Sequence, residues 1–319
     1  MKPKVLIIGA GFVGGTLYKV LSKLEGYEVL IHDKFRETCK LAKEVENINW
    51  CNPNITDDFN ADIFFICLPT PMVIDVGCAD TSLITDWVSR IDRSNKHLAE
   101  VVIKSTVPPG FTAGASGKFG GGVFFNPEFL TEKNALEDFI NLPYQIIGTT
   151  GNSKPIKTTK LFKDCYAQGL LKCRDIYETS ATTAEMVKYT RNCYLATRIS
   201  FFNEINQFCE RTKVPFDEMK QLAGLDERVG NHYNRIDPEE PEFSGHCLPK
   251  DINALISKYK DFDLKPTVLT AVWEKNLEVA KKREWEKMDG RAVSGKQTKK
   301  YKMIKKMMAD DKQRKLNKR

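Results

Sequence analysis

The sequence predicts an α/β protein in which a doubly wound parallel sheet is followed by an α-helical domain. Three observations lead to this fold class. Short, continuous apolar runs alternate with helical patterns through the first half of the chain, as expected for strands buried on both faces. A glycine-rich turn joins the first apolar run to the first helical pattern. From Thr182 to Arg211 a long stretch without proline or glycine replaces the alternation.

Length and composition indicate a globular protein of more than one domain. The chain has 319 residues, of which 29% are charged and 41% are hydrophobic, enough for two domains. We find no apolar run long enough to cross a membrane, and because the N-terminus is strand-like we expect no signal peptide. The nine cysteines form no C-x-x-C pair. They favour reduced thiols in the cytoplasm over a disulfide framework or a zinc site, and no metal is expected.

The positive charge is concentrated at the C-terminal end. The whole chain has a formal net charge of +7, whereas residues 289–319 contain 12 Lys or Arg and 3 Asp or Glu, a net of +9. The remainder therefore carries −2. We predict that 289–319 is a disordered tail or a loose basic helix. It is either a solvated tail or a contact for an acidic partner, and nucleic acid is not expected.

The first element is a strand over Lys4–Gly9, followed by a helical pattern over Thr16–Lys23. The turn between them has the form G-x-G-x-x-G, in which glycines permit a tight turn, close approach of a pyrophosphate and close helix–strand packing. The helix N-terminus then faces the phosphates. We assign the cofactor NAD to this Rossmann-type turn, with these residues in contact: Gly9, Gly11, Phe12, Val13 and Gly14.

The next strand, 27–32, ends at Asp33, 19 residues after Gly14. A carboxylate at this position binds the ribose hydroxyls of NAD and repels the extra phosphate of NADP. The neighbouring Lys34 and Arg36 weaken that discrimination.

Four further strands are predicted at 61–67, 101–104, 122–125 and 144–148, with a helix over 155–167 and a strand-like segment over 170–174. Ligands in such sheets bind beyond the carboxyl ends of the strands. We therefore expect Pro69, Thr70 and Thr106 to line the cofactor, although ordinary turn chemistry would also explain these loops.

The second half is predicted to be helical. Thr182–Arg211 forms one long helix with Thr182 or Thr183 near its N-cap, and Pro215–Ala223 and Thr267–Met288 form two more. Lys188 and Asn192 share a face of the long helix because they are four residues apart. A helical lysine is commonly a solvated charge, so spacing alone does not assign Lys188 a role. The predicted domains are 1–178, 179–288 and the tail 289–319.

Cys247 precedes a helix in which Pro249 is a favourable first residue. The amides and dipole of a helix N-terminus favour an anion, and the thiolate is the reactive form of cysteine. Lys250 adds a nearby positive charge, and Asp251 follows one turn after Cys247. The alternative is a buried, inert thiol.

Seven stretches in this order resemble the UDP-glucose/GDP-mannose dehydrogenase family: GAGFVG, ICLPTP, KSTVPPG, NPEFLTE, AEMVKYTRNCYLATRISFFNEI, GLDERVG and FSGHCLPKD. The resemblance spans about residues 2 to 280. It implies two successive NAD-dependent oxidations of the C6 alcohol of a nucleotide sugar, such as UDP-glucose, to a carboxylate. It also implies a homodimer.

The resemblance places the family's nucleophile at Cys247, which would form a thiohemiacetal and then a thioester. Lys188, supported by Asn192, would stabilise oxyanions, and Asp251 would help to hold the water and the lysine. Further roles are implied for Glu128 in acid–base chemistry and for Thr106 in positioning a catalytic water. The resemblance adds Glu132 to the cofactor contacts, and it implies these substrate contacts: Glu128, Phe129, Leu130, Lys188, Asn192, Arg228, Gly245 and Lys250. Arg228 would reach the partner's substrate across a dimer.

Two features depart from the family. The family's third domain, which grips the nucleotide, is not expected in the 31 residues after 288. The loop 234–242 is acidic and lacks glycine, which should repel a diphosphate, and His246 replaces a small residue. Two alternatives therefore stay open: an oxidoreductase that performs one oxidation on a smaller sugar, and a non-catalytic NAD-binding or scaffold protein with a basic tail.

Overall fold

The computed structural model describes residues 2–51, 61–74, 76–94, 99–117 and 122–294. They fall into two compact units. The first contains residues 1–70 and 81–188, and the second contains 71–80 and 189–319. The part of the predicted basic tail from 295 onward lies outside the described residues.

The first unit is built on a seven-stranded sheet with the order β2-β1-β3-β5-β6-β7-β8. Neighbouring strands are parallel except β6 and β7, which pair antiparallel through Phe125 and Gly148. The sheet is therefore mostly parallel, as the sequence predicts. The strands are β1 (Lys4–Ile8), β2 (Glu28–His32), β3 (Ile63–Ile66), β5 (Glu100–Ile103), β6 (Gly122–Phe125), β7 (Tyr144–Thr149) and β8 (Asp175–Ser180).

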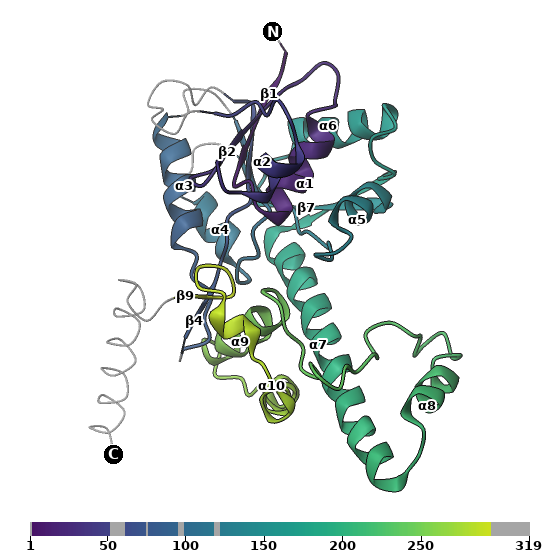
Figure 1. Ribbon diagram of the computed structural model, residues 1–319. Helices are drawn as coiled ribbons and strands as arrows, with labels where there is room; N and C mark the ends of the chain where they lie inside the picture. The colour runs from purple at the N-terminus through teal and green to yellow at the C-terminus, as the bar shows by residue number, and fades with distance from the viewer. Residues whose placement is uncertain (1, 52–60, 75, 95–98, 118–121, 295–319) are drawn as a thin grey trace, which may run out of the picture. The chain divides into compact units, whose positions relative to one another are not determined.

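Helices cover both faces of this sheet, because successive strand residues point to opposite sides. Val5, Ile7 and Phe65 pack on one face with α1, α5 and α6, whereas Leu6 and Ile8 pack on the other with α3. Figure 1 shows these helices on the two sides of the strands. Their bounds are α1 (Phe12–Leu21), α2 (Lys40–Glu44), α3 (Ser82–Ser94), α4 (Phe111–Ser116), α5 (Ala135–Asn141) and α6 (Ile156–Ala167).

The second unit is mainly helical. The long helix α7 (Ala181–Thr212) begins in the first unit and continues into the second, as predicted from its lack of proline and glycine. Its other elements are α8 (Phe216–Ala223), α9 (Leu248–Lys260), α10 (Thr267–Val279), the 3-10 helix η1 (Glu284–Lys287) and a two-stranded sheet of β4 (Met72–Val73) and β9 (Val293–Ser294). Phe243, Trp273 and Trp285 pack together in this unit, with neighbouring ring centroids 6.1 and 5.8 Å apart.

Three predicted helix ends differ from the structure. The hydroxyl of Ser180 accepts the Thr183 N–H at 3.0 Å, so Ser180, not Thr182 or Thr183, caps α7. Helix α9 begins one residue before Pro249. Helix α10 ends at Val279 and not at 288, because the carboxylate of Glu242 accepts the backbone N–H groups that would have continued it.

Two other predicted segments also differ. The strand predicted over 170–174 is wrong, since Leu170 and Leu171 donate their N–H groups to Cys165 at the end of α6; the strand β8 follows at 175–180. Residues 289–294, assigned to the tail, are ordered, because β9 pairs with β4 and Val293 is buried. Among the described residues, no helix is both long and apolar enough to span a bilayer.

Candidate active site

The glycine-rich turn between β1 and α1 has the geometry that the sequence predicts. Gly9 has a φ of +100°, and a Cβ there would lie 2.5 Å from the Cys67 carbonyl oxygen. A Cβ on Gly14 would lie 1.9 Å from the Gly9 carbonyl oxygen. Gly9 and Gly14 are therefore required by the fold of the turn itself.

Gly11 differs from the other two glycines, since a Cβ there would meet no atom within 4 Å. Gly11 is the exposed N-cap of α1 and has no capping side chain. The backbone is thus accessible at a helix N-terminus, which suits the pyrophosphate of NAD. Phe12 and Val13, also assigned to the cofactor, form the half-buried start of this helix.

Asp33 lies beside the same turn. Its carboxylate accepts the Ala10 N–H at 2.6 Å and the Phe35 N–H at 2.7 Å. The end of β2 therefore brings the predicted ribose-binding carboxylate to the glycine-rich turn. The glycine-rich turn and Asp33 therefore suit the pyrophosphate and the ribose of NAD, respectively.

The loops that follow β3 and β5 are joined by hydrogen bonds. Thr70 donates its hydroxyl to the Thr106 carbonyl at 2.7 Å, and the Ser105 hydroxyl accepts the Leu68 N–H at 2.9 Å. Thr70 and Thr106 are buried, and Pro69 is exposed. The structure thus brings together the three loop residues that the sequence assigns to the cofactor.

Glu128 and Lys188 form a buried ion pair in the first unit. The Lys188 Nζ donates to Glu128 Oε1 and to the Glu128 carbonyl, each at 2.8 Å, and Leu130 donates its N–H to Glu128 Oε2 at 3.0 Å. The two side chains are 6% and 4% exposed. Burial raises the pKa of the Glu128 carboxyl, but the Lys188 ammonium outweighs burial and holds that pKa below its usual range. The solvated interpretation of Lys188 is therefore wrong.

The loop after Glu128 contains three further predicted site residues. Phe129 and Leu130 are half-buried, and the Phe129 ring centroid lies 5.9 Å from the Lys188 Nζ. Glu132 is exposed. Phe129 and Leu130 therefore adjoin the ion pair.

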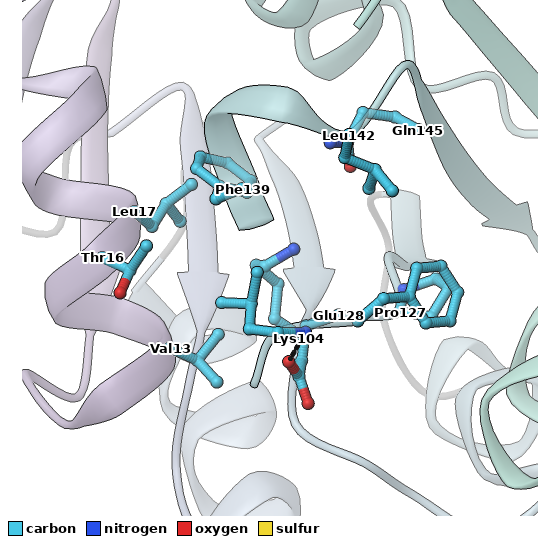
Figure 2. A pocket seen from close by; sticks show the side chains of 11 residues that line it. Val13, Thr16, Leu17, Lys104, Pro127, Glu128, Phe139, Leu142 and Gln145 are labelled. Atoms are coloured by element: carbon cyan, nitrogen blue, oxygen red, sulfur yellow. Dashed lines mark hydrogen bonds between the residues drawn. The ribbon is translucent and has the colours of Figure 1, made fainter. Parts of the chain in front are cut away.

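Lys104 is a buried charged residue that sequence reasoning did not assign to the site. It lines a small cavity beside the loop that follows Glu128. The cavity has a volume of about 10 Å³ and is lined by Lys104, Glu128 and Gln145 among others (Figure 2). The Lys104 ammonium donates to Asn126 Oδ1 at 2.6 Å, and Asn126 donates to Gln145 Oε1 and to the Ile146 carbonyl. Burial lowers the pKa of Lys104 to about 8. The sequence did contain one indication of this residue's importance: Lys104 comes at the end of an apolar strand, and a buried cation needs a hydrogen-bonding partner.

In the second unit, Cys247 is the N-cap of α9. Its carbonyl accepts the Asp251 N–H at 3.0 Å, and Pro249 occupies the first turn. Gly245 has a φ of +75°, with open space where a side chain would lie. The thiol is half-buried. The structure thus places Cys247 at a helix N-terminus, as the sequence predicts.

Asp251 is held by two neighbours. Asn192 donates its amide to Asp251 Oδ2 at 2.6 Å, and the Lys250 ammonium pairs with Oδ1. All three residues are buried. Lys250, predicted as a substrate contact, is therefore bonded to the carboxylate that follows it.

Arg228 differs from these residues because its side chain is 90% exposed. It pairs with Asp226 in its own loop, and this pairing lowers the pKa of the Asp226 carboxyl. The described contacts of Arg228 thus place it at the surface of the second unit.

The acidic loop 234–242 carries less free charge than its sequence suggests. Glu240 pairs with Lys282 at 2.6 Å, and Glu242 is buried and accepts three backbone N–H groups. The bonding of these two carboxylates weakens the case that the loop repels a diphosphate.

Comparison with known proteins agrees with the motifs. The NAD binding domain of the UDP-glucose/GDP-mannose dehydrogenase family matches residues 53–168, and its central domain matches residues 182–278. The UDP-glucose 6-dehydrogenase of Rickettsia typhi is 31% identical over 262 residues, covering 80% of this chain and 58% of that protein. The UDP-glucose 6-dehydrogenase of Campylobacter jejuni is 31% identical over 300 residues, covering 88% and 73%.

Solved structures agree with the fold. The UDP-glucose dehydrogenase of Pyrobaculum islandicum superposes with a TM-score of 0.73 at 26% identity, covering 87% of this chain and 68% of that one. The chain spans 58% of the length of the Rickettsia typhi relative. With both family domains matched in order, the chain belongs to the UDP-glucose/GDP-mannose dehydrogenase family.

Proposed function

We propose that this chain oxidises the C6 alcohol of a nucleotide sugar, such as UDP-glucose, to a carboxylate in an NAD-dependent reaction. Family membership and the names of the relatives support this proposal. The observation that carries it is the presence, in one chain, of a thiol at a helix N-terminus of the second unit and of a buried cation–carboxylate pair, Lys188 and Glu128, in the first unit. Oxidation through a thioester needs both a nucleophile and a charge that stabilises oxyanions.

Cys247 is proposed as the nucleophile. Its thiolate adds to the carbonyl carbon of the aldehyde formed by the first oxidation and gives a thiohemiacetal. The second oxidation converts this adduct to a thioester, and water cleaves the C–S bond to release the acid and the thiol. Bound NAD supplies the hydride acceptor in each oxidation.

Lys188 is proposed to stabilise the oxyanions, because it is a buried cationic side chain whose Nζ donates to the Glu128 carboxylate. Glu128 is ionised and can accept a proton from the attacking water, which Thr106 would position. Asn192 lies one helical turn from Lys188 on α7 and bonds Asp251. This spacing supports a shared role for the two residues toward one substrate.

The remaining substrate contacts are proposed from the family motifs and from placement. Phe129 and Leu130 adjoin the ion pair, and Gly245 leaves open space two residues before the thiol. Lys250 would act through Asp251, and exposed Arg228 would reach a partner's substrate.

The proposal includes a homodimer in the cytoplasm. Tyr194, Phe201 and Phe208 are seven residues apart on α7, so they lie on one face, and all three are exposed. A second copy covering this face would bury them. A nucleophilic thiol, and nine cysteines of which none forms a disulfide within the described residues, suit a reducing compartment.

The test is NADH formation at 340 nm with NAD and a panel of nucleotide sugars, sugar phosphates and free sugars, with NADH counted per substrate consumed. Two NADH on UDP-glucose support the proposal. One NADH with aldehyde accumulation would support a single oxidation, and absence of turnover with intact NAD binding would support the scaffold alternative.

Cys247→Ser should reduce acid release on the order of a thousandfold or more. Cys78→Ser, which changes another half-buried thiol of the second unit, is the matched control and should leave release unchanged. Normal acid formation by Cys247→Ser would refute the thioester route.

A further inference from the structure

Residues 241–243 lie shortly before Cys247 in the second unit. Hydrogen bonds connect this segment to α7, to α10 and to the residues that follow α10. Asn203 of α7 donates its amide to the Pro241 carbonyl at 2.7 Å. Asn276 of α10 accepts the Phe243 N–H at 2.7 Å and donates to the Phe243 carbonyl at 3.2 Å. The amide of Asn276 thus satisfies both backbone groups of Phe243, as a neighbouring strand would.

Glu242, which lies between Pro241 and Phe243, has a buried side chain. Its carboxylate accepts the N–H groups of Lys281, Lys282 and Arg283 at 3.0 to 3.2 Å. The backbone here is unusual, since Arg283 has a φ of +47°. Three convergent amides at the end of α10 form an anion site that this carboxylate fills.

The three side chains that make these contacts are buried. Asn203, Glu242 and Asn276 are 3%, 6% and 1% exposed. We call these three side chains the clamp. They come from α7, from the loop itself and from α10, so no single element accounts for the placement of Pro241–Phe243.

The clamp fixes one end of the short segment that leads to Cys247. Only Ser244, Gly245 and His246 separate Phe243 from Cys247, which is the N-cap of α9. Helix α9 is fixed in turn through Asp251, to which Asn192 of α7 donates its amide. A segment this short, with both ends held and a glycine at positive φ, has few conformations.

We propose that Asn276, Glu242 and Asn203 are positioning residues that hold the Cys247 thiol at the N-terminus of α9. The inference rests on the proposed role of Cys247, but its test does not need turnover. A thiol at a helix N-terminus is more nucleophilic because local amides favour the thiolate. Loosening the clamp lets the thiol leave that position.

The experiment measures the alkylation rate of Cys247 by iodoacetamide at pH 7, followed by mass spectrometry of the peptide that contains it. Asn276→Ala should slow alkylation by on the order of tenfold, since small displacements of a reacting group have large effects on rate. Hydrogen exchange of the 243–247 segment should become faster in the same variant. Asn276→Asp keeps the acceptor for the Phe243 N–H and should recover part of the rate.

Ser200→Ala is the matched control. Ser200 of α7 is 4% exposed, and its hydroxyl donates to the Val272 carbonyl of α10 at 3.1 Å and not to Pro241–Phe243. It removes a buried hydrogen bond between the same two helices. Ser200→Ala should therefore lower stability without slowing alkylation.

Glu242→Gln and Asn203→Ala are milder variants that keep the inference testable if Asn276→Ala does not fold. Each should slow alkylation severalfold. An unchanged or faster rate in the folded clamp variants, or an equal loss in Ser200→Ala, would overturn the inference. If the wild-type chain is active, Asn276→Ala should lower kcat with little change in the KM for NAD; an inactive wild type would contradict the proposed function while leaving the alkylation test intact.

Discussion

At the residue scale, several charged side chains of this chain are buried, and each is held by a specific partner. Glu128 is paired with Lys188, and Asp251 with Lys250. Glu100 accepts N–H groups at the start of α6, including that of Thr158 at 2.7 Å. Removing one partner of such a pair leaves a buried charge without compensation. The loss of folding free energy is then far larger than for a surface ion pair.

Lys188→Met should therefore destabilise the chain by about 3–5 kcal/mol at pH 7. The Glu128 pKa is lowered in the folded state, so the pair's stabilisation is present above the ordinary carboxyl pKa and is lost as the pH falls through the folded value. Urea unfolding at pH 7 and at pH 3 measures both effects, and the difference between variant and wild type should shrink at pH 3. Lys157→Met is the control, because its pair with Asp62 is 39% and 42% exposed and should be worth about 0–1 kcal/mol. Equal losses in the two variants would contradict this expectation.

Lys104 gives a second pH dependence of the same sign as that of Glu128, but at higher pH and from burial instead of from a favourable partner. Its pKa is lowered to about 8 by burial, so between about pH 8 and its unfolded value near 10.4 the unfolded chain binds more protons, and stability rises with pH. Lys104→Met should remove this contribution, which amounts to about 3 kcal/mol at most. The measurement is the free energy of unfolding of wild type and variant at pH 7 and pH 10. A constant difference between the two proteins would show that Lys104 does not titrate in this range.

Lys104 also illustrates which part of the site could be predicted. Cys247, Lys188 and Glu128 stood in recognisable motifs, and the chemistry of those residue types was predictable. Asn126, which bonds Lys104, directly follows β6, and Gln145, which bonds Asn126 in turn, lies on β7, so these contacts depend on strand order and register. Such long-range contacts leave no local pattern in the sequence.

At the element scale, strands and helix interiors followed from periodicity, whereas the ends did not. The span of α7 was predicted within one residue at each end. The end of α10 was missed because it depends on Glu242, a residue distant in sequence. Residues 175–180 lacked a buried apolar run, since β8 is an edge strand whose side chains are mostly exposed.

The glycine-rich turn provides a test at this scale, because Gly14 is required by close packing within the turn whereas Gly11 is expected to leave room for the cofactor. Gly14→Ala should destabilise the chain by about 1–3 kcal/mol, since the new Cβ would overlap the Gly9 carbonyl.

Gly11→Ala has open space and an ordinary φ of −73°, so it should be neutral or stabilise the chain by up to about 1 kcal/mol. It should nevertheless weaken NAD binding by on the order of tenfold, the effect of 1.4 kcal/mol, because the methyl group occupies the approach to the helix N-terminus. Thermal unfolding and calorimetric titration with NAD separate the two effects. Unchanged NAD affinity in Gly11→Ala would place the pyrophosphate elsewhere.

At the scale of the whole molecule, both units have their own buried core, and the family's two matched domains follow the same order. The sheet, six of its seven strands and the following helical region were predictable because each of these elements had its own periodic pattern, whereas β8 had none. The single antiparallel pairing of β6 with β7 was not, since direction is not encoded in an apolar run.

Assembly is tested on the α7 face, where Tyr194, Phe201 and Phe208 are 52%, 57% and 67% exposed. If a second copy covers this face, Phe201→Glu places a charge in an apolar interface and should convert the dimer to a monomer, raising the dissociation constant on the order of a hundredfold or more. Light scattering during size-exclusion chromatography measures the mass directly. The control is Val268→Glu on α10, because Val268 is 65% exposed and lies on a different helix; it should leave the mass unchanged. A wild-type chain that is monomeric at high concentration, or a dimer that persists in Phe201→Glu, would exclude this face as the interface. A monomeric wild type would also remove the partner whose substrate Arg228 is proposed to reach.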